Sequence, residues 1–112
     1  MEVFGLLEKG LNIRAFYHRI LATNIANVET PGYKEKQIDF MAELEKTGVG
    51  TENITVSEKM ESEGYHSIDG NTVNIEDQMV KLAENSLMFS SFVKLISKKL
   101  SMMKYAINEG RR

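Results

Sequence analysis

Several residue types are absent or scarce in this chain of 112 residues, and each absence removes a class of function. The chain has no cysteine, which excludes disulfide bonds, thiolate metal sites and a cysteine nucleophile. Its two histidines, His18 and His66, are too few for a metal site built from several imidazoles. No apolar run approaches the roughly 20 residues that a helix needs to cross a bilayer. Glu2 and the lack of a basic leading segment predict that there is no cleavable secretory signal.

The spacing of residues along the chain also matches no catalytic, metal-binding or phosphate-binding motif. His18 has no carboxylate three or four residues away, and no second strong ligand is placed near His66. The stretch 69–74 fails the template of a calcium-binding loop, because its glycine stands at the second position rather than the sixth. No glycine-rich phosphate loop and no Ser/His/Asp set is present. We therefore expect no catalysis, no metal and no cofactor.

Charge is nearly balanced overall but unevenly distributed along the chain. The 14 basic and 16 acidic residues leave no basic excess that would indicate a nucleic-acid partner. Residues 34–72 carry four basic and nine acidic side chains, whereas residues 73–112 carry seven basic and four acidic ones. We divide the chain accordingly into an N-terminal helix and turn (1–33), an irregular insertion (34–72) and a long C-terminal helix (73–112).

The first segment has the periodicity of a helix that is buried on more than one side. Apolar residues recur at spacings of three and four on overlapping rows from Phe4 to Val28. Gly5 and Gly10 each cost about 1 kcal/mol relative to alanine in a helix, so we expect the first turns to be weak.

The run 27–33 predicts the end of this helix. Pro31 disfavours helical geometry at Thr30. Pro31 and Gly32 fit the two central positions of a type II turn, because glycine accepts the positive φ that the second position requires. We expect the chain to leave the helix axis at this turn.

The insertion is the least regular part of the sequence. Residues 40–46 fit two helical turns, with Asp39 as the N-cap and Gly48 beyond the end. The loose alternation over residues 51–57 predicts a short strand, and the polar residues 60–70 predict a loop. The insertion has too few large apolar residues for a core of its own.

The third segment carries the strongest periodic signal. Alternate steps of four and three from Ile75 meet an apolar residue at nine of ten positions, and only Ser86 interrupts them. This heptad pattern predicts a helix from about 75 to 108, roughly 50 Å long, with Asn74 as its N-cap and Gly110 as its C-cap. The nine apolar members, which we call the assembly seam, are Ile75, Met79, Leu82, Phe89, Val93, Ile96, Leu100, Met103 and Ile107.

These patterns predict an all-α fold in which two long terminal helices pack as a coiled-coil-like pair, joined by a short irregular or β-containing insertion. We expect the assembly seam to pack on the first segment. The two helices still have more apolar surface than one antiparallel pair can cover, which predicts association with other chains. Met79→Asp or Ile96→Asp, each a charge placed on the seam, should abolish that association.

Asn24 and Asn27 stand one turn apart near the end of the first helix, and two interpretations stay open. They are ordinary helix-end residues that cap carbonyls, or they are a polar device within an interface. A buried asparagine costs stability but fixes register, because it must meet a hydrogen-bonding partner.

Two motifs resemble a known family. Residues 21–34, LATNIANVETPGYK, resemble the N-terminal signature of bacterial flagellar rod, hook and hook-filament junction proteins, with Thr23 in place of an asparagine. Residues 69–73, DGNTV, the following AEN at 83–85 and the ending 99–111 are similar to the C-terminal half of the proximal rod family, flagellar basal-body rod protein B.

The resemblance implies a structural subunit whose terminal helices pack and stack with neighbours into the hollow, torque-transmitting rod in the periplasm. It implies type III export without a cleaved signal, and as partners other copies, other rod proteins and the basal-body ring and export-gate components. Neither nucleic acid nor direct membrane insertion is expected. The residues that it marks as an assembly motif are Asn24, Ile25, Ala26, Asn27, Thr30, Pro31, Gly32 and Tyr33.

An alternative from another class is a soluble helical-hairpin adaptor or export chaperone that binds one amphipathic partner helix. It explains the seam but not the Thr-Pro-Gly-Tyr motif. A helix lying on a membrane surface is a weaker third interpretation, because the first half of the long helix is acidic.

Overall fold

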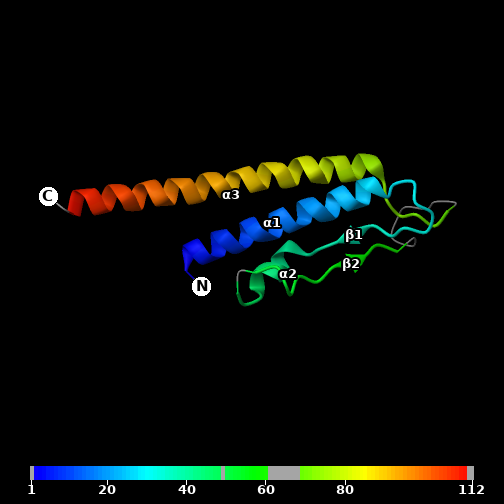
Figure 1. Ribbon diagram of the computed structural model, residues 1–112, viewed down its shortest axis with the longest axis horizontal. Helices are drawn as coiled ribbons and strands as arrows, with labels where there is room; N and C mark the ends of the chain where they lie inside the picture. The colour runs from blue at the N-terminus through cyan, green and yellow to red at the C-terminus, as the bar shows by residue number, and fades with distance from the viewer. Residues whose placement is uncertain (1, 49, 61–68, 111–112) are drawn as a thin grey trace.

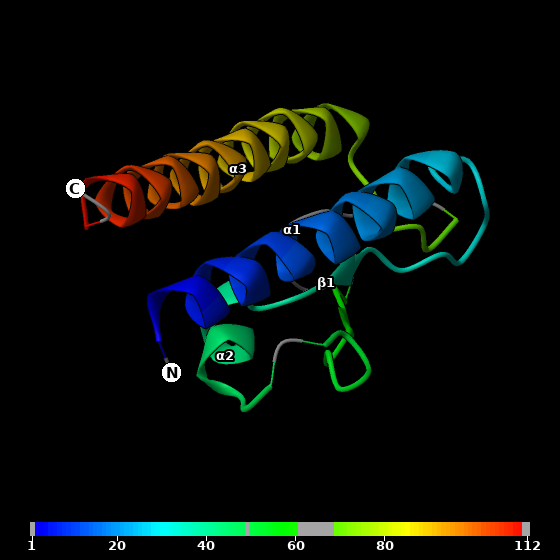
Figure 2. The same ribbon diagram turned by 60° about the vertical axis from the view of Figure 1, so that its left-hand side comes forward.

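The computed structural model describes residues 2–48, 50–60 and 69–110. The elements follow one another as α1 (Val3–Ala26), β1 (Lys36–Gln37), α2 (Phe40–Glu45), β2 (Ser57–Glu58) and α3 (Ile75–Gly110). Helices α1 and α3 lie side by side and run in opposite directions along a molecule of 70 × 26 × 19 Å (Figures 1 and 2). The predicted all-α fold, with two packed terminal helices and a short β-containing insertion, is confirmed.

Helix α1 is the central element of the fold. It lies between α3 and the insertion (Figure 1), and it contacts α3, α2 and β1. Ile13 and Leu21 are completely buried, as expected for a helix that is covered on more than one side. The prediction drawn from its overlapping apolar rows is therefore confirmed.

Both ends of α1 are capped by polar groups. At the start, the Glu2 carboxylate accepts hydrogen bonds from the amides of Phe4 and Gly5, which have no helical partner. At the other end the helix stops at Ala26, just before the predicted turn. Gly32 there has a φ of +76°, as the turn requires, and the Tyr33 amide donates to the Thr30 carbonyl at 3.2 Å.

The short helix of the insertion agrees with its prediction to within one residue. The Asp39 carboxylate caps α2 by accepting from the Ala42 amide at 3.1 Å. The helix ends at Glu45, and Gly48 follows with a φ of +85°.

The strand predicted over residues 51–57 is displaced toward the C-terminus. Strand β2 begins only at Ser57 and pairs with β1 in antiparallel register, Lys36 opposite Glu58 and Gln37 opposite Ser57. Strand β1 was not anticipated. The reason for the displacement is local, because the Ile54 amide donates to the Thr51 carbonyl at 3.4 Å and forms a turn where the strand was expected. Residues 61–68 of the predicted loop, including His66, lie outside the described residues.

Helix α3 begins where predicted and runs further than predicted. The Asn74 side chain caps it by accepting from the Asp77 amide at 3.1 Å. The helix continues through Gly110, so this glycine is its last described residue rather than a cap beyond the end. With 36 residues against 24, α3 is about 18 Å longer than α1, and its C-terminal part extends past the start of α1 (Figure 1). Within the described part of the chain, no helix combines the length and apolarity that crossing a bilayer would need.

Candidate assembly site

The two sequence motifs meet at one end of the helix pair. The Gly32 amide donates to the Asp69 carbonyl at 2.8 Å, and the Thr72 amide donates to the Tyr33 carbonyl at 3.0 Å. Segments that are far apart in the sequence therefore form one unit, which we call the motif junction (residues 24–36 and 69–78).

Asn24 is the hub of the motif junction. It is 0% exposed, and its Nδ2 donates to the Lys36 carbonyl at 2.9 Å and to Gln78 Oε1 at 3.0 Å. Its Oδ1 accepts from the Lys36 amide at 2.9 Å and from the Tyr33 hydroxyl at 3.2 Å. One side chain thus ties α1 to β1 and to α3. Of the two interpretations of Asn24, the geometry favours the register device, and the register is that of two helices within one chain.

Asn27 has the other role, that of a helix-end cap. Its Nδ2 donates to the Thr23 carbonyl at 2.8 Å, and its Oδ1 accepts from the Thr30 hydroxyl at 3.0 Å. These bonds link the last turn of α1 to the turn that follows. The side chain makes no bond to α3 among the described residues.

Asn71, in the segment that precedes α3, binds the same turn. It is buried, and its Nδ2 donates to the carbonyls of Asn27, Val28 and Thr30 at 2.9, 3.1 and 2.7 Å. These carbonyls lie at or beyond the end of α1, where helical partners are lacking. Asn71 belongs to the run 69–73 that resembles the rod family, but its spacing in the sequence did not indicate that it caps the end of α1.

A partly buried ion pair joins Glu35, the residue before β1, to α3 beside the junction. Glu35 is buried, and its Oε2 lies 2.9 Å from Lys81 Nζ, which also lies 3.0 Å from an Asp77 oxygen. Burial by itself lowers the pKa of Lys81, but the hydrogen bonds to Glu35 and Asp77 outweigh this effect and raise the pKa overall. The charged form of Lys81 is therefore the one that the fold favours.

A second cluster fixes the middle of the helix pair and docks α2 on it. Asn85 donates to the Arg14 carbonyl at 2.8 Å and accepts from Arg14 Nη1 at 3.2 Å. The guanidinium lies 3.9 Å from the Phe40 ring centroid, and burial lowers the Arg14 pKa. Phe40 in turn lies 6.1 Å from Phe92, and a Cβ at Gly10 would come within 2.9 Å of the Phe92 ring. Gly10 therefore allows the close approach of the two helices.

The expectation that the assembly seam packs on α1 is wrong for most of its members. The row of α3 that faces α1 is Gln78, Asn85, Phe92 and Lys99, at intervals of seven, with the first two buried. From the seam, only Leu82 and Ile96 are half-buried. The remaining seven are more than a third exposed: Ile75, Met79, Phe89, Val93, Leu100, Met103 and Ile107.

The physical reason is that polar partners across the interface select the buried face. Asn24 and Arg14 provide hydrogen bonds to Gln78 and Asn85, so a polar row of α3 is satisfied in the interior. An apolar period alone does not identify that row. Met79 and Ile96 are consequently not equivalent, because Met79 is 53% exposed whereas Ile96 is half-buried.

Helix α3 leaves a large apolar surface uncovered. Among the described residues, only Ile13, Leu21 and Val73 are fully buried apolar side chains. Apart from the seam, six further large apolar side chains of α3 are exposed: Val80, Leu87, Met88, Leu95, Met102 and Tyr105. Extended exposed apolar surface is typical of sites that bind other proteins.

Comparison with known proteins identifies relatives over nearly the whole chain. No protein-family model matches it. The flagellar basal body rod protein FlgB of Cereibacter sphaeroides is 32% identical over 120 residues, which cover 95% of this chain and 94% of the relative. FlgB of Proteus mirabilis is 30% identical, with 97% and 96% covered, and FlgB of Salmonella typhimurium is 30% identical, with 92% and 91% covered. The chain therefore belongs to the family of flagellar basal body rod protein FlgB, and it is a structural protein of the rod rather than an enzyme.

Proposed function

We propose that this protein is a subunit of the proximal part of the rod and that the exposed apolar faces of α3 carry its contacts with neighbouring subunits. The observation that supports this is the exposure of thirteen large apolar side chains along that one helix. Burial of each contributes roughly 1.5–3 kcal/mol. Covering a part of this surface is enough to offset the cost of association, which is about 4–15 kcal/mol.

The length of α3 favours an open-ended assembly. Its last eleven residues, 100–110, are all exposed and extend beyond the start of α1 (Figure 1). If the extension of one subunit packs on a different surface of its neighbour, the contact is head-to-tail. Contacts of this head-to-tail kind continue into helical assemblies unless they close into a ring.

The assembly motif divides between the interior and the surface. Asn24 holds the fold together, whereas Ala26, Thr30, Pro31 and Gly32 are exposed at the end of the helix pair. We assign these exposed residues to contacts with other subunits. The buried members then act indirectly, by setting the direction in which the turn leaves α1.

In this proposal the partners are other copies of the chain, other rod proteins, and the ring and export-gate components at the base of the rod. The subunit leaves the cytoplasm through the flagellar export apparatus without a cleaved signal and becomes part of a hollow shaft that transmits torque. Membership of the family supports this assignment. The alternative of an adaptor or export chaperone is not favoured, because the relatives that span the whole chain are rod proteins.

Charge placed on the extension of α3 tests the proposal. Leu100 and Ile107 are 55% and 56% exposed, so Leu100→Asp and Ile107→Asp should change the free energy of unfolding by less than about 0.5 kcal/mol. Each should nevertheless abolish rod assembly, because an aspartate would be buried without a partner between subunits. Chemical unfolding measures the first effect, and isolation of basal bodies together with swimming assays measures the second.

Ser101→Asp is the matched control, since it adds the same charge to the exposed, polar side of the same helical turn. It should assemble like the unchanged chain. Normal rods from Leu100→Asp and Ile107→Asp would show that the extension of α3 makes no subunit contact, and the proposed role of this surface would be withdrawn.

A further inference from the structure

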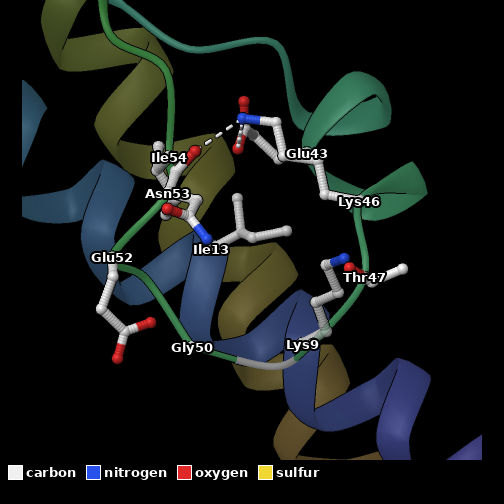
Figure 3. A pocket seen from close by; sticks show the side chains of 10 residues that line it. Lys9, Ile13, Glu43, Lys46, Thr47, Gly50, Glu52, Asn53 and Ile54 are labelled. Atoms are coloured by element: carbon white, nitrogen blue, oxygen red, sulfur yellow. Dashed lines mark hydrogen bonds and ion pairs between the residues drawn. The ribbon is translucent and has the colours of Figure 1, made fainter.

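A small cavity lies on the insertion side of α1. Lys9 and Ile13 of α1, Glu43 of α2, and Lys46, Thr47 and Asn53 of the loop that follows line this cavity of about 130 Å³ (Figure 3). Since about 10–15 Å³ of such space is enough for one water molecule, it has room for a small organic anion. Neither the motif junction nor the exposed faces of α3 contribute to it.

Lys9 brings an uncompensated positive charge to this cavity. It is 3% exposed, and its Nζ has no hydrogen-bond partner among residues 2–48, 50–60 and 69–110. Figure 3 shows the side chain extending from α1 toward Thr47. Ile13 beside it is completely buried and provides no hydrogen-bonding group.

The other charged groups of the cavity are already engaged or directed elsewhere. Glu43 Oε1 lies 2.9 Å from Lys46 Nζ, and Glu43 Oε2 accepts from the Thr55 amide at 3.3 Å. Lys46 Nζ also donates to the Asn53 carbonyl at 2.6 Å. Glu52 also lines the cavity, and its carboxylate lies beside Gly50 (Figure 3). With Glu52 included, the charges of the lining sum to zero, but Lys9 is the lining cation that has no hydrogen-bond partner among the described residues.

We propose that this cavity is a binding site for a single carboxylate group, with Lys9 as the cationic anchor. A buried ammonium has three hydrogen-bond donors, and without a counter-charge it strongly destabilises the fold. A carboxylate supplies both the missing charge and two acceptor oxygens. A dianion such as phosphate fits less well, because a single cation opposes it and Glu43 lies in the same cavity.

The first experiment measures binding to the free chain. The ¹⁵N-labelled protein is titrated with sodium acetate, and sodium chloride keeps the ionic strength constant, while the amides of Thr47, Asn53 and Ile54 are followed by NMR. Acetate should produce saturable shifts that are lost in Lys9→Met and retained in Arg19→Met, which removes an exposed cation from the same helix. Absence of saturable shifts, equal shifts in Lys9→Met, or tighter binding of inorganic phosphate than of acetate would overturn the proposal.

The second experiment measures Tm. Replacing Lys9 should raise Tm if the lysine serves to bind a ligand, and should lower it if the lysine stabilises the free chain. Without added carboxylate, Lys9→Met should raise Tm by about 5 °C, because an apolar chain replaces an unpaired buried charge. Arg19→Met should leave Tm within about 1 °C. A lower Tm for Lys9→Met would mean that the lysine stabilises the free chain, and the site would be withdrawn.

A third experiment, incorporation of the chain into rods, identifies the source of the carboxylate. At least tenfold weaker incorporation of Lys9→Met into rods, with competition by acetate in the unchanged chain, would assign an acidic side chain of a neighbouring subunit. Normal incorporation would assign a small free carboxylate. Both results support carboxylate binding, and because acetate binding is measured on the free chain, its failure would leave the proposed rod function unaffected.

Discussion

At the scale of single residues, buried amide side chains determine how the two long helices are aligned. Asn24, Asn71, Gln78 and Asn85 are all buried, and each has a hydrogen-bond partner in another segment. A buried amide that loses its partner costs about 1–3 kcal/mol. A shift of α3 along α1 would break the pairs of both Gln78 and Asn85, so these residues exclude alternative registers.

The hub residue Asn24 provides the sharpest test of this view. Asn24→Leu keeps the approximate volume but removes the Asn24 partner of the Lys36 amide, of the Lys36 carbonyl and of Gln78 Oε1. We expect the free energy of unfolding to fall by about 3 kcal/mol or more. Asn27→Ala, which removes only bonds near the helix end, should cost about 1 kcal/mol. Equal losses in urea unfolding would contradict the assignment of Asn24 as the hub.

The pKa shifts of three residues predict how the free energy of unfolding changes in alkaline solution. Burial raises the pKa of Tyr17 and of Tyr33. Burial lowers the pKa of Lys81, but its hydrogen bonds to Glu35 and Asp77 raise it overall. Each group therefore loses its proton at a lower pH in the unfolded chain than in the folded one. Their contribution to stability is complete below about pH 9 and is lost as the pH rises through the folded-state values.

Thermal unfolding between pH 8 and 11 checks this expectation. Tm should fall above about pH 10, and Tyr17→Phe should reduce the slope because one of the three groups no longer titrates. Tyr105→Phe is the matched control. Because Tyr105 is exposed, this substitution should leave the slope unchanged. A Tm that is constant to pH 11 would argue against the linkage.

At the scale of elements, Gly10 of α1 is a position where the two long helices are in tight contact, because a Cβ there would meet the Phe92 ring. Gly10→Ala gains about 1 kcal/mol of helix propensity. The added methyl group, however, meets the Phe92 ring at 2.9 Å, and the ring is already packed against Phe40. Overpacking of this kind costs about 1–3 kcal/mol, so we expect net destabilisation.

Circular dichroism during chemical unfolding measures this balance. Gly10→Ala should lower the free energy of unfolding by about 1 kcal/mol, and a second substitution, Phe92→Leu, should relieve most of the clash. Gly110→Ala, at a position where a Cβ would meet nothing within 4 Å, should be neutral or slightly stabilising. A more stable Gly10→Ala variant would show that the helices are not in tight contact at this point.

At the scale of the whole molecule, the free chain is an incomplete structure whose apolar surface exceeds its apolar core. Hydrogen exchange should reveal this difference along the sequence. The amides of residues 100–110 should exchange rapidly in the free chain, because no other element of the described structure covers them, and should become strongly protected in the rod. The amides of residues 13–24 in α1 should be protected in both states. Strong protection of residues 100–110 in a monomer would contradict the need for neighbours.

The sequence alone determined the elements, because their signals are local. Helix periods, the caps at Asp39 and Asn74 and the turn at Pro31 and Gly32 depend on residues within a few positions of one another. The sequence motifs also indicated the family. The short strand β1 and the start of β2 were missed, since their pairing depends on a partner distant in the chain.

Only the tertiary structure decided which face of α3 is buried. The apolar period favours the row that contains Met79 and Val93, yet the row that faces α1 contains Gln78 and Asn85. The choice depends on whether a polar group finds a partner across the interface, and such partners lie 54 and 71 residues away in the sequence. Hydrogen-bond satisfaction in an interior is a property of three-dimensional neighbours, so spacing along one helix does not reveal it.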